Sequence, residues 1–235
     1  MKKYQRTELL IGQDGIEKLN NSCVAVFGLG GVGSYIAEAL ARSGVGKLIL
    51  VDNDIVCESN INRQLIALNS TIGKPKVNVC AERISDINAD IKAVPLQMFY
   101  TAENADSFDM NGIDYIADAI DTVSSKLELI ERSDKMNISI ISCMGTGNKL
   151  DPTKFEVTDI YKTSVCPLAR VMRHELKKRE IRKLKVLYST EPPVINKAVP
   201  EIHNKKVSPG SIAFVPSVAG LIIAGEIVKD ITGII

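Results

Sequence analysis

The stretch VAVFGLGGVGSYIAEALARSG, residues 24–44, combines an apolar run, a glycine cluster and apolar residues at helical spacing. Gly28, Gly30 and Gly33 fit the pattern G-x-G-x-x-G between a predicted strand and a predicted helix that ends at Gly44. Glycines let the backbone approach a phosphate chain, and the amides at a helix amino terminus carry partial positive charge. The stretch therefore predicts a nucleotide site, although proteins that bind NAD or FAD share the same pattern.

Strand and helix patterns alternate through this stretch and beyond it, from residue 23 to about residue 144. Such alternation predicts an α/β fold with a Rossmann-like, doubly wound, mainly parallel sheet. The C-terminal half differs, because we expect an outer strand near 154–161 and a charged helix over 167–184. Further strands over 185–190 and 212–215 and an apolar helix over 218–231 complete the prediction of antiparallel additions in this half.

Bulk composition excludes several classes of protein. The net charge of the 235 residues is +1, and the five cysteines form no CxxC pair, which argues against a disulfide framework and a tetracysteine zinc site. The first residues lack the apolar core of a signal peptide, and the chain has no run of about 18 apolar residues. We therefore expect a soluble, cytoplasmic protein with no membrane partner.

The segment from Asp52 to Lys76, DNDIVCESNINRQLIALNSTIGKPK, separates the nucleotide classes. Asp52 ends the second predicted strand, where an acid binds ribose hydroxyls. Arg63 and Lys76 follow it, together with the polar Asn60 and Gln64. A dinucleotide has no use for two strong cations here, whereas a triphosphate needs its charge offset while pyrophosphate leaves. These residues favour ATP.

The segments GLGGVG, DNDIVCESNINRQ, GKPK and DAIDT resemble the adenylating domain of the ubiquitin-activating-enzyme-like superfamily, the ThiF/MoeB/HesA group. The resemblance implies ATP and Mg²⁺ as ligands and a carboxylate that attacks the α-phosphate. It implies an ATP-binding set of Gly28, Gly30, Gly31, Gly33, Asp52, Asp54, Asn60, Arg63, Gln64 and Lys76. It also implies that Asp121 binds the metal and that the catalytic set is Arg63, Lys76, Asp121 and Arg6.

The same resemblance implies a domain organisation and a partner copy. We expect one ThiF-type adenylating domain over 1–235, with an ATP-binding half (5–150) and a substrate-side half (151–235). The second half contains the basic helix and a flexible loop over 191–210, rich in proline and polar residues. Arg6 resembles the N-terminal arginine that reaches into the partner subunit's site, which implies a homodimer.

The ATP-binding residues alone do not distinguish between two carboxylate substrates. These are the C-terminus of a ubiquitin-like carrier protein and threonylcarbamoyladenosine in tRNA. Residues 170–185 contain eight Lys or Arg and two acids, a concentration that suits a phosphate backbone. The candidate tRNA-binding residues are Arg170, Arg173, Lys177 and Arg182.

Three further segments bear on this choice: CPLARVMRHELKKREI, LYSTEPP and PGSIAFVPSVAGLIIAGEIV. They resemble the branch of the superfamily that dehydrates threonylcarbamoyladenosine in tRNA. The resemblance implies ATP-dependent cyclisation through an acyl-adenylate, with AMP and pyrophosphate as products. It also implies a cysteine desulfurase or sulfur-acceptor system as a further partner.

The alternatives make different demands on the chain. An adenylyltransferase for a sulfur-carrier protein would give Cys166 a nucleophilic or sulfur-accepting role. An NAD-dependent oxidoreductase would leave Arg63 and Lys76 without a purpose. His203, in the long loop, is a further candidate for substrate contact.

Overall fold

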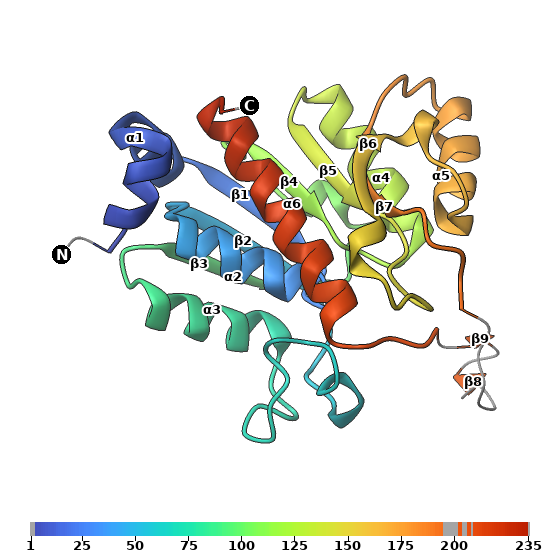
Figure 1. The fold of residues 1–235 in the computed structure, drawn as a ribbon, viewed down its shortest axis with the longest axis horizontal. Helices are drawn as coiled ribbons and strands as arrows, with labels where there is room; N and C mark the ends of the chain where they lie inside the picture. The colour runs from blue at the N-terminus through green and yellow to red at the C-terminus, as the bar shows by residue number, and fades with distance from the viewer. Residues whose placement is uncertain (1–2, 195–201, 204–205, 208, 235) are drawn as a thin grey trace.

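The computed structural model describes residues 3–194, 202–203, 206–207 and 209–234 (Figure 1). The strands are β1 (Cys23–Phe27), β2 (Lys47–Asp52), β3 (Lys92–Gln97), β4 (Tyr115–Asp118), β5 (Ser139–Cys143), β6 (Phe155–Asp159), β7 (Lys185–Ser189), β8 (Ile202–His203) and β9 (Lys206–Val207). The α-helices are α1 (Gln5–Asn20), α2 (Gly33–Ser43), α3 (Lys76–Ile87), α4 (Val123–Lys135), α5 (Pro167–Lys178) and α6 (Phe214–Thr232). Short 3₁₀ turns are η1 (Glu58–Asn60), η2 (Ala105–Ser107), η3 (Pro152–Lys154) and η4 (Ile160–Lys162).

A seven-stranded sheet in the order β3-β2-β1-β4-β5-β7-β6 forms the centre of the fold. Its neighbouring strands are parallel except for the edge strand β6, which pairs antiparallel with β7. The predicted doubly wound sheet with antiparallel additions is therefore confirmed. The strand order reverses between β1 and β4, and such a switch point opens a crevice outside the carboxyl ends of the strands.

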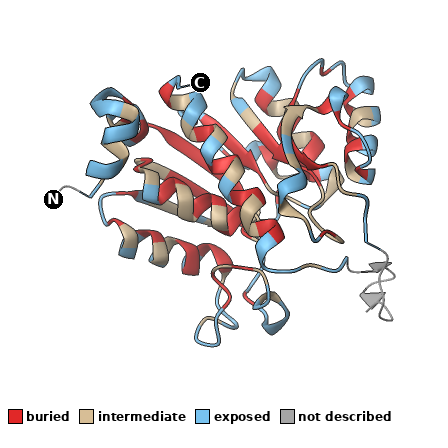
Figure 2. Cartoon of the chain, in the orientation of Figure 1, coloured by how far each residue is buried: buried red, intermediate tan, exposed pale blue. Residues whose placement is uncertain are grey.

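Both faces of the central strands are covered, which is why β1 is apolar without alternation. Val24 and Val26 pack with residues of α2, α3 and α6 on one face. Ala25 and Phe27 pack on the other face with α4 and the segment after β3. A further cluster joins α4, α5 and β7. Figure 2 shows the sheet as a buried layer between helices that expose their outer sides.

Two predictions about the C-terminal half are wrong in their bounds. Helix α5 ends at Lys178 rather than at Leu184, because Glu180 takes a left-handed φ of 58° and the amide of Ile181 turns back to Leu176. The expected strand over 212–215 does not form, since α6 already begins at Phe214.

Pro216 is compatible with this early start of α6. A proline in the first turn of a helix removes no hydrogen bond, because the amide there has no intrahelical partner. Gly220 then lets α6 lie against the start of α2, where a Cβ would stand 2.5 Å from the carbonyl oxygen of Val32. Close packing on α2 therefore makes this apolar stretch helical.

Helix α1 has a break at Gly12 (φ 71°, ψ 171°), where the backbone leaves the helical conformation. Half of the predicted flexible loop over 191–210 falls outside the described residues, and so does the side chain of His203. Of the helices in the described part of the chain, none combines the length and the apolar character needed to span a membrane.

Candidate active site

The glycine turn lies at the switch point of the sheet, directly after β1. Gly28 takes a φ of 84°, and a Cβ on it would stand 2.7 Å from the carbonyl oxygen of Ala119, just after β4. A Cβ on Gly33 would lie 1.7 Å from the carbonyl oxygen of Gly28. Gly30 is different, because its nearest neighbour would be the Gln64 amide at 3.8 Å. Gly28 and Gly33 therefore shape the turn, while Gly30 leaves open space beside it.

Asp52, at the end of β2, braces the glycine turn. Its Oδ2 accepts a 2.6 Å hydrogen bond from the Leu29 amide, and its Oδ1 accepts one from the Asp54 amide at 2.8 Å. Burial raises the pKa of this carboxyl, and the charge of Lys76 and the two amides oppose that shift. Each oxygen keeps a second lone pair, so the carboxylate can also accept hydroxyl donors.

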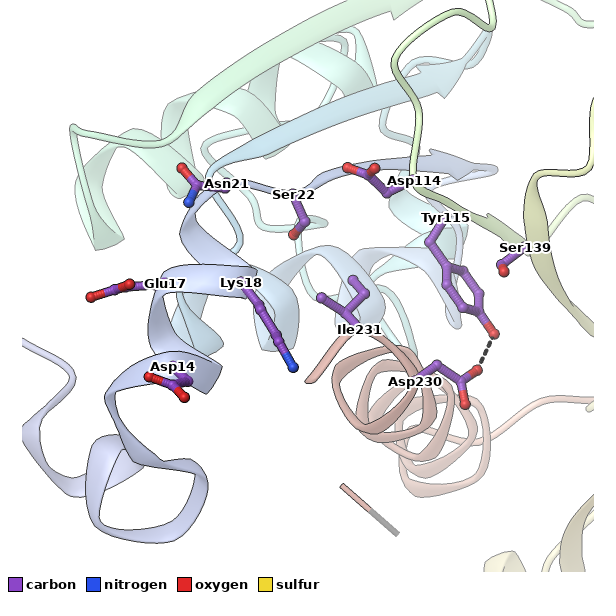
Figure 3. A pocket seen from close by; sticks show the side chains of 10 residues that line it. All are labelled: Asp14, Glu17, Lys18, Asn21, Ser22, Asp114, Tyr115, Ser139, Asp230 and Ile231. Carbon is purple, nitrogen blue, oxygen red and sulfur yellow. Dashed lines mark hydrogen bonds between the residues drawn. The ribbon is translucent and has the colours of Figure 1, made fainter. Parts of the chain in front are cut away.

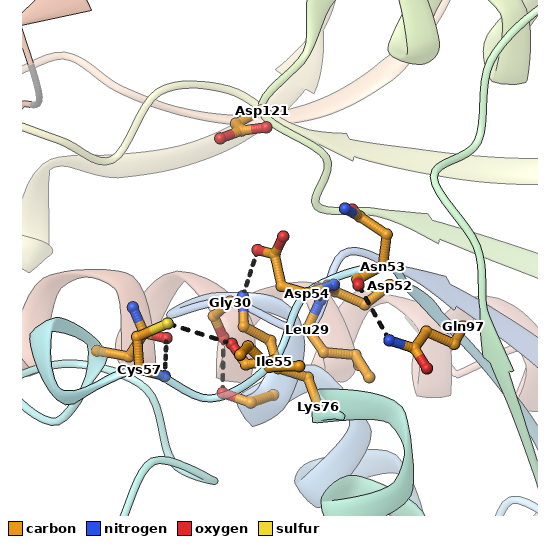
Figure 4. A network of polar contacts seen from close by, with 12 residues as sticks. Leu29, Gly30, Asp52, Asn53, Asp54, Ile55, Cys57, Lys76, Gln97 and Asp121 are labelled. Carbon is orange, nitrogen blue, oxygen red and sulfur yellow. Dashed lines mark hydrogen bonds and ion pairs between the residues drawn. The ribbon is translucent and has the colours of Figure 1, made fainter. Parts of the chain in front are cut away.

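Lys76 begins α3 and is only 4% exposed. Its Nζ lies 2.7 Å from Oδ2 of Asp54, which holds the ammonium in place (Figure 4). Asp121 lies across from this ion pair, in the turn after β4 (Figure 4). A cation and a carboxylate therefore face one space from opposite sides.

The space between these groups is a cavity of about 510 Å³ at the carboxyl edge of the sheet. Ten of the residues predicted from the sequence are among those that line it: Gly28, Gly30, Gly31, Asp52, Asp54, Asn60, Arg63, Gln64, Lys76 and Asp121. Residues from the second half also contribute walls, among them Leu168, Pro209 and Ser211. The structure thus brings the two halves of the chain together at this cavity.

The remaining predicted residues lie elsewhere. Gly33 packs inside the turn, and Arg6 is exposed on α1. Arg170 and Lys177 are exposed on α5, whereas Arg173 turns back to donate to the carbonyl oxygen of Thr163 at 3.0 Å. Arg182 is exposed but follows the end of α5, so it does not extend the basic face of that helix.

Cys166 caps α5 and is 4% exposed among Leu127, Met144 and other apolar side chains. It is absent from the described lining of the cavity. Cys143 does line the cavity, but burial raises the pKa of its thiol to about 12. A protonated thiol is a weak nucleophile, so Cys143 lacks the surroundings of an activated thiol, and Cys166 lies among apolar side chains away from the described lining of the cavity.

Sequence reasoning missed the hydroxyl groups of Tyr100 and Ser125 at this site, although it included Gln64 in the ATP-binding set. Within the described ranges, the buried Gln64 Oε1, Tyr100 hydroxyl and Ser125 hydroxyl have no hydrogen-bond partner, and all three residues line the cavity. Buried polar atoms without partners are rare in folded proteins and mark places where a ligand or water binds. Their concentration at one cavity indicates a ligand site.

A fully buried ion pair lies under the same edge. The Nζ of Lys126 on α4 is 2.9 Å from Oδ2 of Asp118, at the end of β4, and both side chains are 0% exposed. That oxygen also accepts a 2.6 Å bond from the Ser142 hydroxyl on β5. Lys126 was recognisable only as a lysine among apolar helix positions, next to Leu127, Leu129 and Ile130.

Another cavity, of about 650 Å³, opens at the opposite edge of the sheet, between α1, α6 and the starts of β1 and β4 (Figure 3). Its lining includes Asp14, Glu17, Asp114 and Asp230, with Lys18 as a cation. None of the candidate residues lines it. The glycine turn, the buried acid and the cations make the 510 Å³ cavity the candidate site instead.

A glycine turn at the switch point, a ribose-type acid and two cations define a nucleotide-binding α/β protein of the adenylating kind. The chain belongs to the ThiF family, whose model matches residues 4–235.

Individual proteins of this family are similar to the chain in sequence and in structure. A tRNA threonylcarbamoyladenosine dehydratase of Bacillus subtilis is 48% identical over 97% of this chain and 94% of its own length. The Escherichia coli protein of the same name is 39% identical, over 74% of this chain and 65% of that relative. The crystal structure of the Escherichia coli enzyme TcdA in complex with ATP matches with a TM-score of 0.89 and 32% identity, over 98% of this chain and 94% of that one.

Proposed function

We propose that this protein is an ATP-dependent tRNA threonylcarbamoyladenosine dehydratase. It activates the carboxylate of the modified nucleoside as an acyl-adenylate and releases cyclic threonylcarbamoyladenosine, AMP and pyrophosphate. The observation that carries the ATP site is the cavity at the switch point, where Arg63, Lys76 and Asp121 face one space beside the unpartnered Gln64 oxygen. The identity of the substrate rests on the relatives described above.

The proposed reaction has two steps. The threonyl carboxylate attacks the α-phosphorus of ATP, and the bond to pyrophosphate breaks. A ureido nitrogen of the same base then attacks the activated carbonyl, loses its proton and expels AMP. Because the second step is intramolecular, no enzyme thioester is needed, which agrees with the burial of Cys166.

The chain's own groups supply binding and charge compensation. Arg63 and Lys76 offset the negative charge that develops on the leaving pyrophosphate. Asp52 accepts ribose hydroxyls, and the open face of Gly30 admits the phosphates. Arg63 Nη1 already donates to the carbonyl oxygen of Ser59 at 2.9 Å, so its guanidinium is held at the cavity before ATP arrives.

Magnesium fits this site as a companion of the triphosphate. In the described part of the chain, no group of three or more His, Cys, Asp or Glu could hold a metal. A single carboxylate such as Asp121, together with phosphate oxygens and water, is the usual Mg²⁺ environment. The ion would supply further charge neutralisation at the phosphates.

The proposed tRNA surface is on α5. Arg170 and Lys177 are exposed there, and His174 shares the solvent side. Leu168, in the first turn of the same helix, lines the cavity. A tRNA backbone lying along α5 would therefore bring its modified base close to the adenylating groups.

The proposed homodimer involves α1. Leu9 and Leu10 on this helix are 83% and 84% exposed, beside the exposed Arg6. Two adjacent leucines so open to solvent favour a surface that a second copy covers.

The test uses purified protein, MgATP and tRNA that carries threonylcarbamoyladenosine. We expect mass spectrometry of the digested tRNA to show the loss of one water from this nucleoside, with AMP formed in step. Arg63→Ala and Asp121→Ala should abolish both signals, whereas Lys74→Ala, an exposed control, should not. AMP formed only with a ubiquitin-like carrier, and no dehydration, would replace this proposal with the carrier-activating function.

A further inference from the structure

Asn148 joins two parts of the chain that are distant in sequence. Its Oδ1 accepts a 2.7 Å hydrogen bond from the Gly210 amide, and its own amide donates to the Gly210 carbonyl oxygen at 2.7 Å. Its carbonyl oxygen accepts a bond from the Val194 amide at 2.8 Å. One residue in the turn after β5 therefore fixes the backbone at both positions.

The backbone of Asn148 suits this role. Its φ is 56°, in the left-handed region that asparagine tolerates better than most residues. The neighbouring Gly147 lies against Pro209, where a Cβ would stand 2.7 Å from the proline Cβ. The turn thus contacts Gly210 through the side chain and backbone of Asn148, and Pro209 through the backbone of Gly147.

Asn62 holds the same segment from the nucleotide side. Its Nδ2 donates to the Ser211 carbonyl oxygen at 3.0 Å, and its Oδ1 accepts from Nη1 of Arg63 at 2.9 Å. A continuous path of contacts therefore runs from the triphosphate-binding arginine to Ser211.

The segment held by these two asparagines lies at the candidate site. Pro209, Ser211, Gly147 and Arg63 all line the 510 Å³ cavity. We propose that Asn148 and Asn62 are positioning residues that hold Pro209–Ser211 as the substrate-side wall of the adenylation site, in fixed relation to Arg63. This inference rests on the proposed function. It assigns to Asn148 and Asn62 the alignment of the modified tRNA base with the bound ATP.

The first test compares three single variants in the tRNA dehydration assay. Asn148→Gly keeps the left-handed backbone but removes the acceptor for Gly210, whereas Asn148→Asp keeps the acceptor. Asn137→Gly is the matched control, because Asn137 also has a positive φ (53°) but lies before β5, away from the cavity.

We expect Asn148→Gly to lower kcat/KM for the modified tRNA about 10- to 100-fold, the range that small misplacements of reacting groups cause. The KM for ATP and the melting temperature should stay close to those of Asn137→Gly. Asn148→Asp should keep most of the wild-type kcat/KM for the modified tRNA. Equal losses in Asn148→Gly and Asn148→Asp, or no loss in Asn148→Gly, would overturn the inference.

The second test uses Asn62→Ala and the double variant. Because both asparagines hold one segment, we expect the double variant to lose less than the product of the two single losses. Independent, multiplicative losses would contradict a shared wall. Wild-type protein that does not dehydrate tRNA would refute the proposed function itself, and in that case AMP formation with a carrier protein tests the same wall with the same variants.

Discussion

At the scale of single residues, the glycines of the turn differ in the space around them, although the sequence pattern treats them alike. Gly33 has no room for a side chain because the Gly28 carbonyl oxygen occupies that position. Gly30 has room, and its open side faces the cavity. Gly33 therefore has a structural role, whereas Gly30 leaves room for the proposed ATP.

This distinction predicts opposite outcomes for two alanine variants. Gly33→Ala should lower the free energy of unfolding by about 3 kcal/mol or more, because the backbone must move to admit the methyl group. Gly30→Ala should fold with nearly wild-type stability but bind ATP at least about tenfold more weakly, since its methyl group occupies phosphate space. Denaturant unfolding and calorimetric ATP titration measure the two effects. Similar stability losses in both variants would show that the two glycines have one role.

At the scale of elements, the buried ion pair of Lys126 and Asp118 joins α4, β4 and β5 beneath the site. Asp118 Oδ1 also accepts a 3.1 Å bond from the Ile120 amide, in the turn that carries Asp121. Two charges at 0% exposure cost desolvation energy that their attraction has to offset. The pair is therefore better explained by the placement of the Asp121 turn than by net stability.

The energetics of this pair can be tested with a double-mutant cycle. Lys126→Met leaves the buried Asp118 carboxylate without its counter-charge and should destabilise the protein by about 3–5 kcal/mol. Asp118→Asn should also destabilise it, because the ammonium loses its counter-charge. The double variant Asp118→Asn/Lys126→Met should recover much of the loss in denaturant unfolding. Strictly additive losses would mean that the two side chains do not stabilise each other.

At the scale of the whole molecule, the candidate site draws on segments from Phe27 to Pro216. The proposed dimer would extend it to the partner copy through Arg6, which lies outside the cavity of its own chain on the exposed side of α1. In a symmetric dimer each copy would complete the site of the other.

This arrangement predicts complementation between two inactive variants. Chains with Arg6→Ala and chains with Arg63→Ala, co-expressed with different tags, should give heterodimers with one complete site. Purified through both tags, these heterodimers should have about half of the wild-type dehydration rate. Each homodimeric variant is the control and should be nearly inactive. Inactive heterodimers would place Arg6 in the site of its own chain, whereas an active Arg6→Ala homodimer would place it outside any site.

The sequence alone determined the sheet, the nucleotide turn and most of the polar groups around the cavity. These features depend on local patterns: strand and helix periodicity, the spacing of glycines, and acids or cations directly after strands. Asp52 could be assigned because it ends a parallel strand at this edge of the sheet. Arg63 and Lys76 could be assigned because a triphosphate needs its charge offset and because the segment resembles the adenylating family.

Tertiary structure decided what depends on contacts between distant segments. Helix α6 begins earlier than its pattern predicts because Gly220 lies against α2, and α5 ends early because Glu180 turns the chain back. The burial of Lys126 and the hold of Asn148 on Gly210 have no local signature, since each depends on residues that the fold brings from elsewhere in the chain. Periodicity and residue spacing describe a segment by itself, and packing decides which distant segment it meets.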